Sequence, residues 1–416
     1  MAREQLDERL YQTTAPNGLV VLTEHLPGLR SVAAGVWFRS ASGHERREQM
    51  GIAHLLEHMV FKGTERRSAK ELAHALEVRG GALDAYTSRD HTSFQAHVLD
   101  QDLPLAVEVL SDLVRRPLLR PEDLELERNV VLEEIKGVED TPDDLVFDLA
   151  SAALWPSHPY GYSILGTPET VGALTAADLT AFHRGAYHPR NSVIAAAGNV
   201  DHDRLLEHLA AEGWFDTSLD GDRTPPVAPS PGRRGDRSVV PRETAQAHLV
   251  LGTDTFASRD PRRFALAILV NLLGGGMSSR LFQRVREQLG LAYAIYAYQQ
   301  AYRSAGLLGI YVAAQPAAAE RAREAIAAEL RQLSAGDLTD SELTDGKRQL
   351  QGQLMLALEN PSSRMHRLAG FVLNDDRYRR LDEVLATIDA VSRDDALQVA
   401  GEFLAPERMT VVQLGG

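Results

Sequence analysis

The strongest constraint on the fold of this chain is an internal repeat as long as a domain. The positions of Pro189 and Pro406 differ by 217, and those of Thr175 and Ser392, which we expect to cap helices, differ by the same amount. A period of this length indicates a duplicated domain, because solenoids repeat every ~20 to 50 residues. With 416 residues, the chain is also long enough to build two hydrophobic cores.

The segment between the two repeats, residues 216–237, is rich in proline, glycine, aspartate and arginine. This composition is typical of an exposed linker. We therefore predict an N-terminal domain at residues 1–215 and a homologous C-terminal domain at residues 238–416. A second echo, with an offset of 219, relates residues 139–142 (Glu-Asp-Thr-Pro) to residues 358–361 (Leu-Glu-Asn-Pro).

Each half mixes strand-like and helix-like segments. The expected helices are residues 68–79, capped by Ser68, and the amphipathic segments 104–115 and 121–136, which have proline in the first turn. The expected strands are residues 17–24, 31–38, 82–94 and 92–98. The first two strands are expected to pair as a hairpin. The pattern predicts an α+β fold of two homologous domains, each a mainly antiparallel sheet packed with helices.

The composition excludes several classes of function. The net charge of −14 argues against nucleic-acid and anionic-membrane partners. It would attract a cationic peptide, or it simply reflects a solvated acidic surface. The absence of cysteine excludes disulfides, thiolate metal sites and cysteine-dependent catalysis. No run of 18 apolar residues occurs, and the polar N-terminus has no features of a signal or transit peptide, so we expect a cytoplasmic bacterial protein.

The most informative motif is the run His-Leu-Leu-Glu-His at residues 54–58. Two histidines four residues apart lie on one face of a helix, so both imidazoles can reach one metal ion. Glu57 lies between them, where its carboxylate can approach a water molecule held by that metal. This H-x-x-E-H order is the inverted form of the zinc-protease signature, and it predicts metal-assisted hydrolysis.

The second repeat carries a degenerate copy of this motif. Residues 54–58 shifted by 217 correspond to residues 271–275, Asn-Leu-Leu-Gly-Gly. The two leucines persist, whereas both histidines and the glutamate are replaced. This pattern is expected if the leucines pack in both halves and the polar residues do chemistry in the first half alone.

A catalytic zinc ion needs a third protein ligand. The helix expected from Pro121 offers several carboxylates, namely Glu122, Glu125, Glu127, Glu133 and Glu134. Glu127 and Glu134 lie seven residues apart and therefore on one face, with Val130 and Val131 between them. Valines beside acidic residues suggest a packed face, but ordinary solvated helix charges would give the same periodicity.

Two segments resemble the M16 family of zinc peptidases, in particular the group of the mitochondrial processing peptidase and its bacterial relatives. They are residues 51–64 (Gly-Ile-Ala-His-Leu-Leu-Glu-His-Met-Val-Phe-Lys-Gly-Thr) and 127–135 (Glu-Arg-Asn-Val-Val-Leu-Glu-Glu-Ile). The resemblance covers nearly the whole chain. It implies one Zn²⁺ per chain, held by His54, His58 and Glu134, which stands at the family's spacing from the second histidine. It also implies that Glu57 is the catalytic base and that Glu127 orients a ligand or tunes the bound water.

The resemblance implies two substrate-binding elements. Arg286 and Tyr293 match an Arg–Tyr pair that reaches the zinc site and holds the scissile region of the substrate, although by themselves they could be an ordinary helix end and the start of a strand at residues 293–298. The segment Leu83-Asp84-Ala85-Tyr86-Thr87 matches an edge strand that binds an extended peptide. Many relatives have Asn in place of Asp84, so Asp84 could equally be a polar residue on an ordinary edge strand.

These features predict a zinc-dependent endopeptidase that acts on unfolded oligopeptides or protein segments. Because one chain carries both the metal motif and the Arg–Tyr pair, we expect a homodimer, with a heterodimer containing a degenerate homologue as the alternative. The competing function is that of a non-catalytic core subunit. The glycine-rich residues 274–276 lack the spacing of a phosphate-binding loop, and they suggest either a mobile segment or a tight helix connection.

Overall fold

The structure, a computed structural model, describes residues 1–216 and 221–416, so residues 217–220 of the expected linker lie outside the described residues. The chain forms two compact units, and neither is continuous in sequence. The first unit contains Met1–Ile135, Ser163–Val227 and Ala357–Tyr378, and the second contains Lys136–Tyr162, Ala228–Leu356 and Arg379–Gly416. Residues 221–236 form no helix or strand, and Val227 within them is buried.

The first unit is built on a seven-stranded sheet with the order β1-β2-β3-β7-β4-β6-β5. Its strands are β1 (Ala2–Asp7), β2 (Leu10–Thr14), β3 (Val20–His25), β4 (Ser31–Phe38), β5 (Ala82–Thr87), β6 (Thr92–Leu99) and β7 (Ser192–Gly198). All neighbours are antiparallel except β3 and β7. The sheet is therefore mainly antiparallel, as the sequence predicts.

The predicted hairpin of β3 and β4 is wrong, because β7 lies between these strands and pairs with both of them. Every residue of β7 is buried, and its small side chains fit between two layers of helices. A strand buried on both faces needs a partner on each edge. The short connection between β3 and β4 suggested a hairpin. The order of strands is instead set by β7, which comes much later in the chain and inserts between them.

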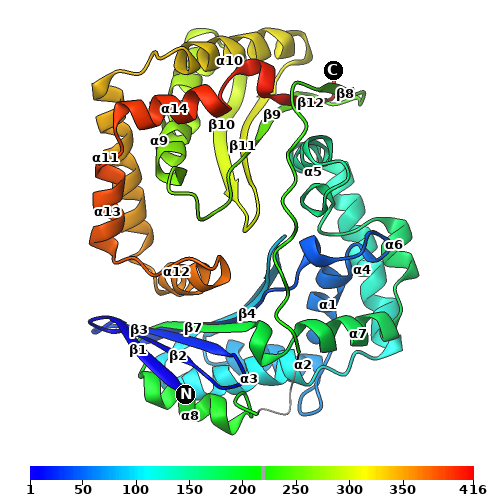
Figure 1. The fold of residues 1–416 in the computed structure, drawn as a ribbon. Helices are drawn as coiled ribbons and strands as arrows, with labels where there is room; N and C mark the ends of the chain where they lie inside the picture. Colours follow the sequence, from blue (N-terminus) through cyan, green and yellow to red (C-terminus); the bar gives the residue numbers. More distant parts are fainter. Residues whose placement is uncertain (217–220) are drawn as a thin grey trace. The chain divides into compact units, whose positions relative to one another are not determined.

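Helices cover both faces of this sheet. The helices of the first unit are α1 (Ile52–Val60), α2 (Ala69–Glu77), α3 (Leu103–Arg115), α4 (Pro121–Asp140), α6 (Pro168–Ala173), α7 (Ala176–Ala186), α8 (His202–Ala211) and α12 (Pro361–Leu373). The predicted cap of α2 is confirmed, because Ser68 and Glu71 form a capping box. One face of the sheet packs with α1, α2 and α3 in a large apolar core, and the opposite face packs against α12 (Figure 1).

The second unit has a five-stranded sheet with the order β10-β11-β9-β12-β8. Its strands are β8 (Arg237–Val240), β9 (Ala247–Thr255), β10 (Ala292–Ala301), β11 (Gly306–Ala314) and β12 (Thr410–Leu414). Its helices are α5 (Pro142–Leu154), α9 (Arg263–Gly274), the π-helix η6 (Phe282–Gln288), α10 (Ala319–Ser334), α11 (Asp340–Ala357), α13 (Leu381–Asp389) and α14 (Arg393–Phe403). The α+β class is confirmed for both units.

The two units exchange one helix each. Helix α5 belongs to the first half of the sequence but packs on β9 and β12 of the second unit, and α12 of the second half packs on β7, β4 and β3 of the first unit. Both helices begin at the prolines of the second echo. The boundaries at 215 and 238 thus separate the two repeats in the sequence. The compact units differ from the repeats because each contains one helix of the other repeat.

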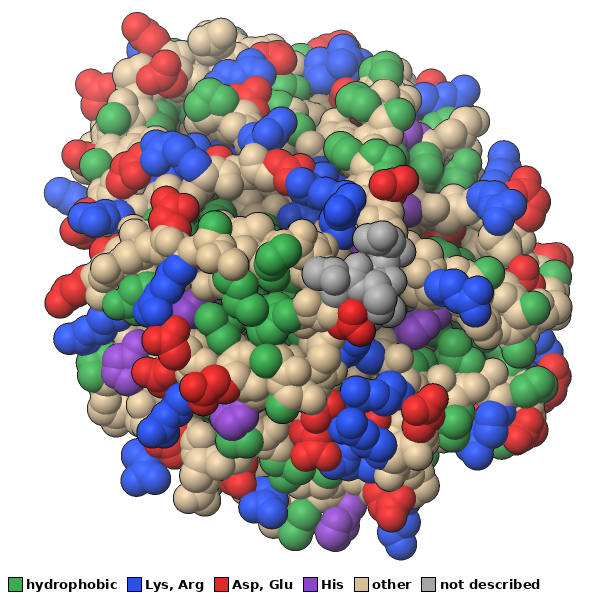
Figure 2. Space-filling model, turned by 60° about the horizontal axis from the view of Figure 1, so that its bottom comes forward, with side chains coloured by type: hydrophobic (Ala, Val, Ile, Leu, Met, Phe, Trp, Pro, Cys, Tyr) green, Lys and Arg blue, Asp and Glu red, His purple; other side chains and the backbone are tan. Residues whose placement is uncertain are grey.

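Charged side chains of both signs share the surface. Figure 2 shows acidic and basic side chains intermixed over one face of the molecule. Among the described residues, no helix is both long enough and apolar enough to cross a lipid bilayer.

Candidate metal centre

Helix α1 carries the H-x-x-E-H motif on the polar side of an otherwise apolar helix. Its apolar residues are fully buried in the core of the first unit, including Leu55 and Leu56. This packing leaves His54, Glu57 and His58 on the remaining face. Gly51 precedes the helix with φ +90°, and a Cβ atom at this position would lie 2.5 Å from the carbonyl oxygen of Leu165. Glycine is therefore required where the chain enters the motif.

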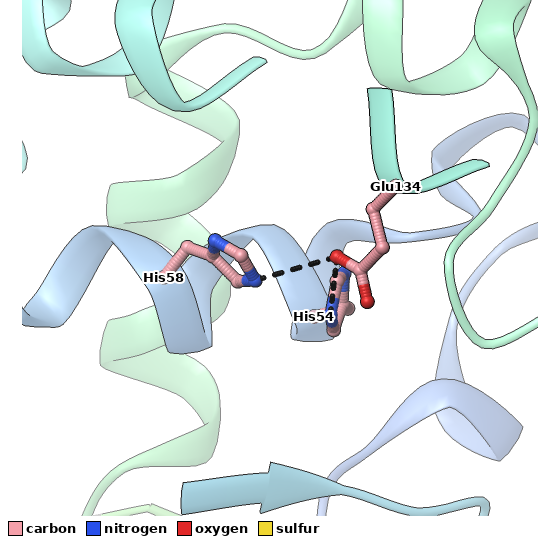
Figure 3. A group of neighbouring side chains, drawn as sticks. All are labelled: His54, His58 and Glu134. Atoms are coloured by element: carbon pink, nitrogen blue, oxygen red, sulfur yellow. Dashed lines mark ion pairs between the residues drawn. The ribbon is translucent and has the colours of Figure 1, made fainter. Parts of the chain in front are cut away.

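The fold brings His54, His58 and Glu134 together. Glu134 comes from α4, and its Oε2 lies 3.6 Å from Nε2 of His54 and 3.7 Å from Nε2 of His58 (Figure 3). One ligand atom from each residue lies within 4.8 Å of the others. Ligands at about 2.0–2.1 Å from a tetrahedral Zn²⁺ are separated by about 3.3–3.5 Å, so the group fits this ion.

The protonation state of His54 also suits a metal ligand. Burial, and to a lesser extent the neighbouring His58, lowers the pKa of His54 to about 4. The imidazole is therefore neutral at physiological pH, and this is the form that binds metal.

Glu127 contacts His58, one of the three candidate ligands, and its supporting role stays a prediction. Its Oε2 lies 3.1 Å from Nδ1 of His58, and its Oε1 accepts a hydrogen bond of 2.7 Å from Nζ of Lys62. Glu127 is buried, so the ammonium group of Lys62 compensates its charge. A carboxylate on the second ring nitrogen orients the imidazole and raises its basicity as a ligand.

The predicted packing of α4 is correct for one valine only. Val131 is fully buried, whereas Val130 is 49 % exposed and lies on the outer side of the helix. Residues 130 and 131 are separated by about 100° around the helix axis, so one of them faces the core with Glu127 and the other faces solvent. Glu134 is exposed, unlike the buried His54.

Glu57 lies beside the three candidate ligands, and its carboxylate contacts the end of β5. Its Oε2 accepts a hydrogen bond of 2.6 Å from Oγ1 of Thr87, the last residue of β5. Burial raises the pKa of Glu57, and the charges of Glu134 and Asp84 raise it too, whereas the hydroxyl of Thr87 and the neighbouring His58 oppose the rise. A carboxylate with a raised pKa is a stronger base than an ordinary one as long as it stays ionised.

Strand β5 is the outer strand of the seven-stranded sheet, as predicted for residues 83–87. Its side chains alternate between the two faces of the sheet. Ala85 packs against the large core and Thr87 contacts Glu57, whereas the hydroxyl of Tyr86 lies 3.1 Å from His91 and Asp84 is exposed. The main-chain groups on the outer edge of β5 have no partner strand within the described residues.

Arg286 and Tyr293 belong to the second unit. Arg286 lies in the π-helix η6, and its guanidinium carbon is 5.3 Å from the centre of the Tyr293 ring and 4.6 Å from that of Phe282. Tyr293, at the start of β10, is 75 % exposed. The fold thus brings the two residues together, and their approach to a zinc site stays a prediction.

Three features of this region have no obvious signal in the sequence. Lys62 lies four residues after His58, a spacing too common to single it out. The hydrogen bond of Thr87 to Glu57 requires the strand to lie beside α1. The third feature is the buried Glu45, whose two carboxylate oxygens accept hydrogen bonds from the backbone at the start of α1.

Comparisons with known proteins define the class of this fold and site. The family described as insulinase (peptidase family M16) matches residues 20–168, and the family described as peptidase M16 inactive domain matches residues 173–350. Together they cover well over half of the chain and include residues of both units. The chain therefore belongs to the M16 family of peptidases, and the resemblance seen in the motifs is confirmed.

Its relatives include several bacterial proteins named as uncharacterized zinc proteases. The chain is 39 % identical over 398 residues to one from Streptomyces coelicolor, covering 94 % of this chain and 87 % of the relative. It is 39 % identical over 379 residues to YmxG of Bacillus subtilis, covering 91 % and 92 %. A protease from Helicobacter pylori of known structure has the same fold, with a TM-score of 0.89 and 23 % identity over 97 % of this chain and 99 % of that chain.

Proposed function

We propose that this chain is a zinc-dependent endopeptidase that hydrolyses peptide bonds in unfolded oligopeptides or protein segments. One observation carries the proposal, namely the convergence of His54, His58 and Glu134 beside the carboxylate of Glu57. Two imidazoles, one carboxylate and an adjacent base are the equipment of zinc peptidases. Zinc bound by these three residues would act as a Lewis acid that polarises the scissile carbonyl and acidifies water.

The residues of α1 and β5 account for the proton transfers. Glu57 accepts a proton from the attacking water and then donates it to the nitrogen of the leaving amine. The hydrogen bond from Thr87 fixes the direction of the carboxylate. Glu127 holds the ring of His58 through Nδ1, so that Nε2 faces Glu134 and the metal position.

The open edge of β5 supports binding of an extended peptide. A substrate strand can pair with the main-chain groups of β5, which makes recognition tolerant of sequence and requires an unfolded segment. Such a peptide would run toward Thr87 and therefore toward Glu57. Asp84 gives this edge a negative charge, which favours cationic peptides.

The second unit supplies two further donors in this proposal. Arg286 and Tyr293 can both donate hydrogen bonds to a carbonyl oxygen that becomes an oxyanion. Because the chain carries this pair as well as the metal motif, we propose a homodimer with two complete sites. Light scattering of the purified protein tests this proposal, and a stable monomer that retains full activity would overturn it.

Zinc content and cleavage of internally quenched peptides test the enzymatic function. The purified chain should bind one Zn²⁺ and cut such peptides, and chelation should abolish cleavage reversibly. Glu57→Gln should retain zinc and lose about 10²- to 10⁴-fold in kcat, because the base is absent and the ligands are intact. Glu207→Gln removes an exposed carboxylate on α8 and serves as the matched control, with wild-type activity.

The alternative of a non-catalytic core subunit makes the opposite prediction. Such a chain would bind no zinc or would cut no peptide after zinc is added. A Glu57→Gln variant that loses zinc together with activity would identify Glu57 as a ligand and contradict its role as the base.

A further inference from the structure

The first turn of α1 is held by a carboxylate from outside the helix. The first four backbone N–H groups of a helix have no partner within it, and a side chain at the N-cap usually satisfies some of them. Here the N-cap is Gly51, which has no side chain to offer. Glu45 takes this role, because its Oε2 accepts a hydrogen bond of 2.9 Å from N–H of Gly51 and its Oε1 one of 2.8 Å from N–H of Ala53.

This turn is also where the metal centre begins. His54 directly follows Ala53 and is the third residue of the helix. A first turn that frays would therefore displace a metal ligand, and not only a solvent-exposed end. The positive end of the helix dipole favours the ionised form of Glu45 and so opposes the effect of its burial.

Glu45 is an unusual residue for a cap because it is buried, with 8 % of its surface exposed. Burial raises the pKa of Glu45 to about 8, although the N–H groups of Ala53 and Gly51 oppose the rise. Burying a carboxyl group is costly compared with placing a serine or asparagine at the N-cap.

The segment before Glu45 connects this turn to strand β5. N–H of Gly43 donates a hydrogen bond of 2.8 Å to the carbonyl oxygen of Arg89, and Oγ of Ser42 donates one of 3.1 Å to that of Ser88. A Cβ atom at Gly43 would lie 2.5 Å from the same oxygen of Arg89, so the close approach requires glycine. Ser88 and Arg89 directly follow Thr87, whose hydroxyl contacts Glu57.

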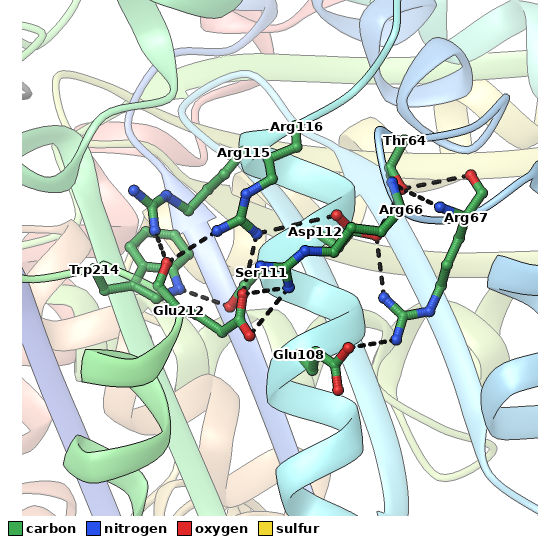
Figure 4. Close-up of polar contacts among 10 residues, drawn as sticks. All are labelled: Thr64, Arg66, Arg67, Glu108, Ser111, Asp112, Arg115, Arg116, Glu212 and Trp214. Carbon is green, nitrogen blue, oxygen red and sulfur yellow. Dashed lines mark hydrogen bonds and ion pairs between the residues drawn. The ribbon is translucent and has the colours of Figure 1, made fainter.

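The other end of α1 is anchored separately. Thr64, six residues after His58, donates a hydrogen bond of 2.6 Å to Asp112 of α3, which also pairs with Arg67 (Figure 4). Asp112 is fully buried. The position of His58 is therefore supported from the C-terminal side, and His54 depends on the N-terminal side.

We propose that Glu45 is a positioning residue of the metal centre, which fixes the first turn of α1 and thereby holds Nε2 of His54 against Glu134. Through Ser42 and Gly43 the same segment keeps this turn in register with the end of β5. The effect on metal affinity follows from the geometry alone, and the effect on catalysis rests on the proposed function.

Zinc affinity, measured by competition with a chromogenic chelator, tests this role without any substrate. Glu45→Ala should weaken zinc binding by about 10- to 100-fold, the range found for residues that orient a ligand. Glu45→Gln retains one acceptor oxygen and should recover part of this loss. Ser68→Ala is the matched control, because it removes the cap of α2, a helix without a metal ligand.

The control separates positioning from general stability. Ser68→Ala should lower the free energy of unfolding by about 1 kcal/mol and leave zinc affinity unchanged. The proposal is overturned if Glu45→Ala and Glu45→Gln bind zinc like the wild type, or if Ser68→Ala weakens binding equally. If Glu45→Ala does not fold, Glu45→Gln with intermediate affinity supports the proposal, and wild-type affinity overturns it. A wild-type chain that binds zinc but cuts no peptide would refute the proposed function and leave this result standing.

Discussion

Helix α1 of the first unit and helix α9 of the second occupy equivalent places in the repeat, yet only α1 carries ionisable residues at the motif positions. His54, Glu57 and His58 correspond, at an offset of 217, to Asn271, Gly274 and Gly275. The leucines of the two motifs are retained, and Leu273 is fully buried like Leu55 and Leu56. The repeat has therefore kept the packing residues and changed the polar ones.

The second unit also has a contact between α9 and α11, the helices that correspond to α1 and α4. At the offset of 219 that relates α5 to α12, Glu134 of α4 corresponds to Gln353 of α11. Nδ2 of Asn271 donates a hydrogen bond of 3.0 Å to Oε1 of Gln353, at the place where His54 faces Glu134 in the first unit. A neutral amide pair stands where two candidate metal ligands meet in the first unit, so this helix contact does not require ionisable residues.

The space next to the motif is used differently as well. In the first unit, Glu57 extends to the hydroxyl of Thr87 on β5. In the second unit, a Cβ atom at Gly274 would overlap the backbone nitrogen of Ala297 on β10. Close packing of α9 against β10 at Gly274 thus fills the place that Glu57 occupies in the first unit. One scaffold can therefore support either a polar site or a close contact at this position.

Converting the first site into the second should give the largest effect. The double variant His54→Asn/Glu134→Gln installs the amide pair that the second unit already contains. We expect zinc content to fall from one ion per chain to none and peptide cleavage to disappear, because a single imidazole remains as ligand. Metal analysis after gel filtration and the melting temperature measure the outcome. A folded variant that still holds one equivalent of zinc would show that the two helix pairs are not equivalent in this way.

The carboxylate that holds His58 should have the next largest effect. Glu127 corresponds to Gly346 in the second unit, where a Cβ atom would lie 3.0 Å from a methyl group of Ile268. Glu127→Gln should weaken zinc binding by about 10- to 100-fold, because His58 loses its charged partner. Glu125→Gln, an exposed change on the same helix, should leave the affinity unchanged.

Removing the hydroxyl of Thr87 should shift the pH dependence of cleavage. This hydroxyl lowers the pKa of Glu57, so Thr87→Val raises that pKa further. The base must be ionised to accept a proton, so the acid limb of kcat/KM should move to higher pH. Hydrogen bonds to charged groups contribute about 1.5–3 kcal/mol, and we expect at least a roughly tenfold loss at neutral pH. Thr87→Ser should restore the profile, and an unshifted limb in Thr87→Val would contradict the role of this contact.

A stability change confined to the second unit should be the smallest effect. Gly274→Ala forces a methyl group against β10 and should lower the free energy of unfolding by about 1–3 kcal/mol without changing zinc affinity. At Gly352, in the exposed middle of α11, a Cβ atom would meet nothing within 4 Å, so Gly352→Ala should instead stabilise the helix by about 0.5–1 kcal/mol. Chemical denaturation measures both changes. An unchanged free energy of unfolding in Gly274→Ala would show that β10 can move away from the added methyl group.

Local features of the fold follow from the sequence because their causes are local. The capping box at Ser68 and the equivalent boxes at Thr175 and Ser392 are formed as expected, since a cap involves residues three apart. The order of strands is a different matter. The hairpin of β3 and β4 fails because β7, which comes much later in the chain, supplies the pairing that a central strand needs.

The residues alone predict the two repeats, the α+β class, the face of α1 that carries the candidate ligands and the absence of these residues from α9. Helical spacing and residue type act over a few positions. Periodicity left five glutamates of α4 as candidates, and the family resemblance singled out Glu134. The folded structure was needed to establish that Glu134 meets both histidines, that Glu45 holds the start of α1, and that α5 and α12 exchange units. Most of these contacts join residues far apart in the chain, and the packing of the whole domain sets their geometry.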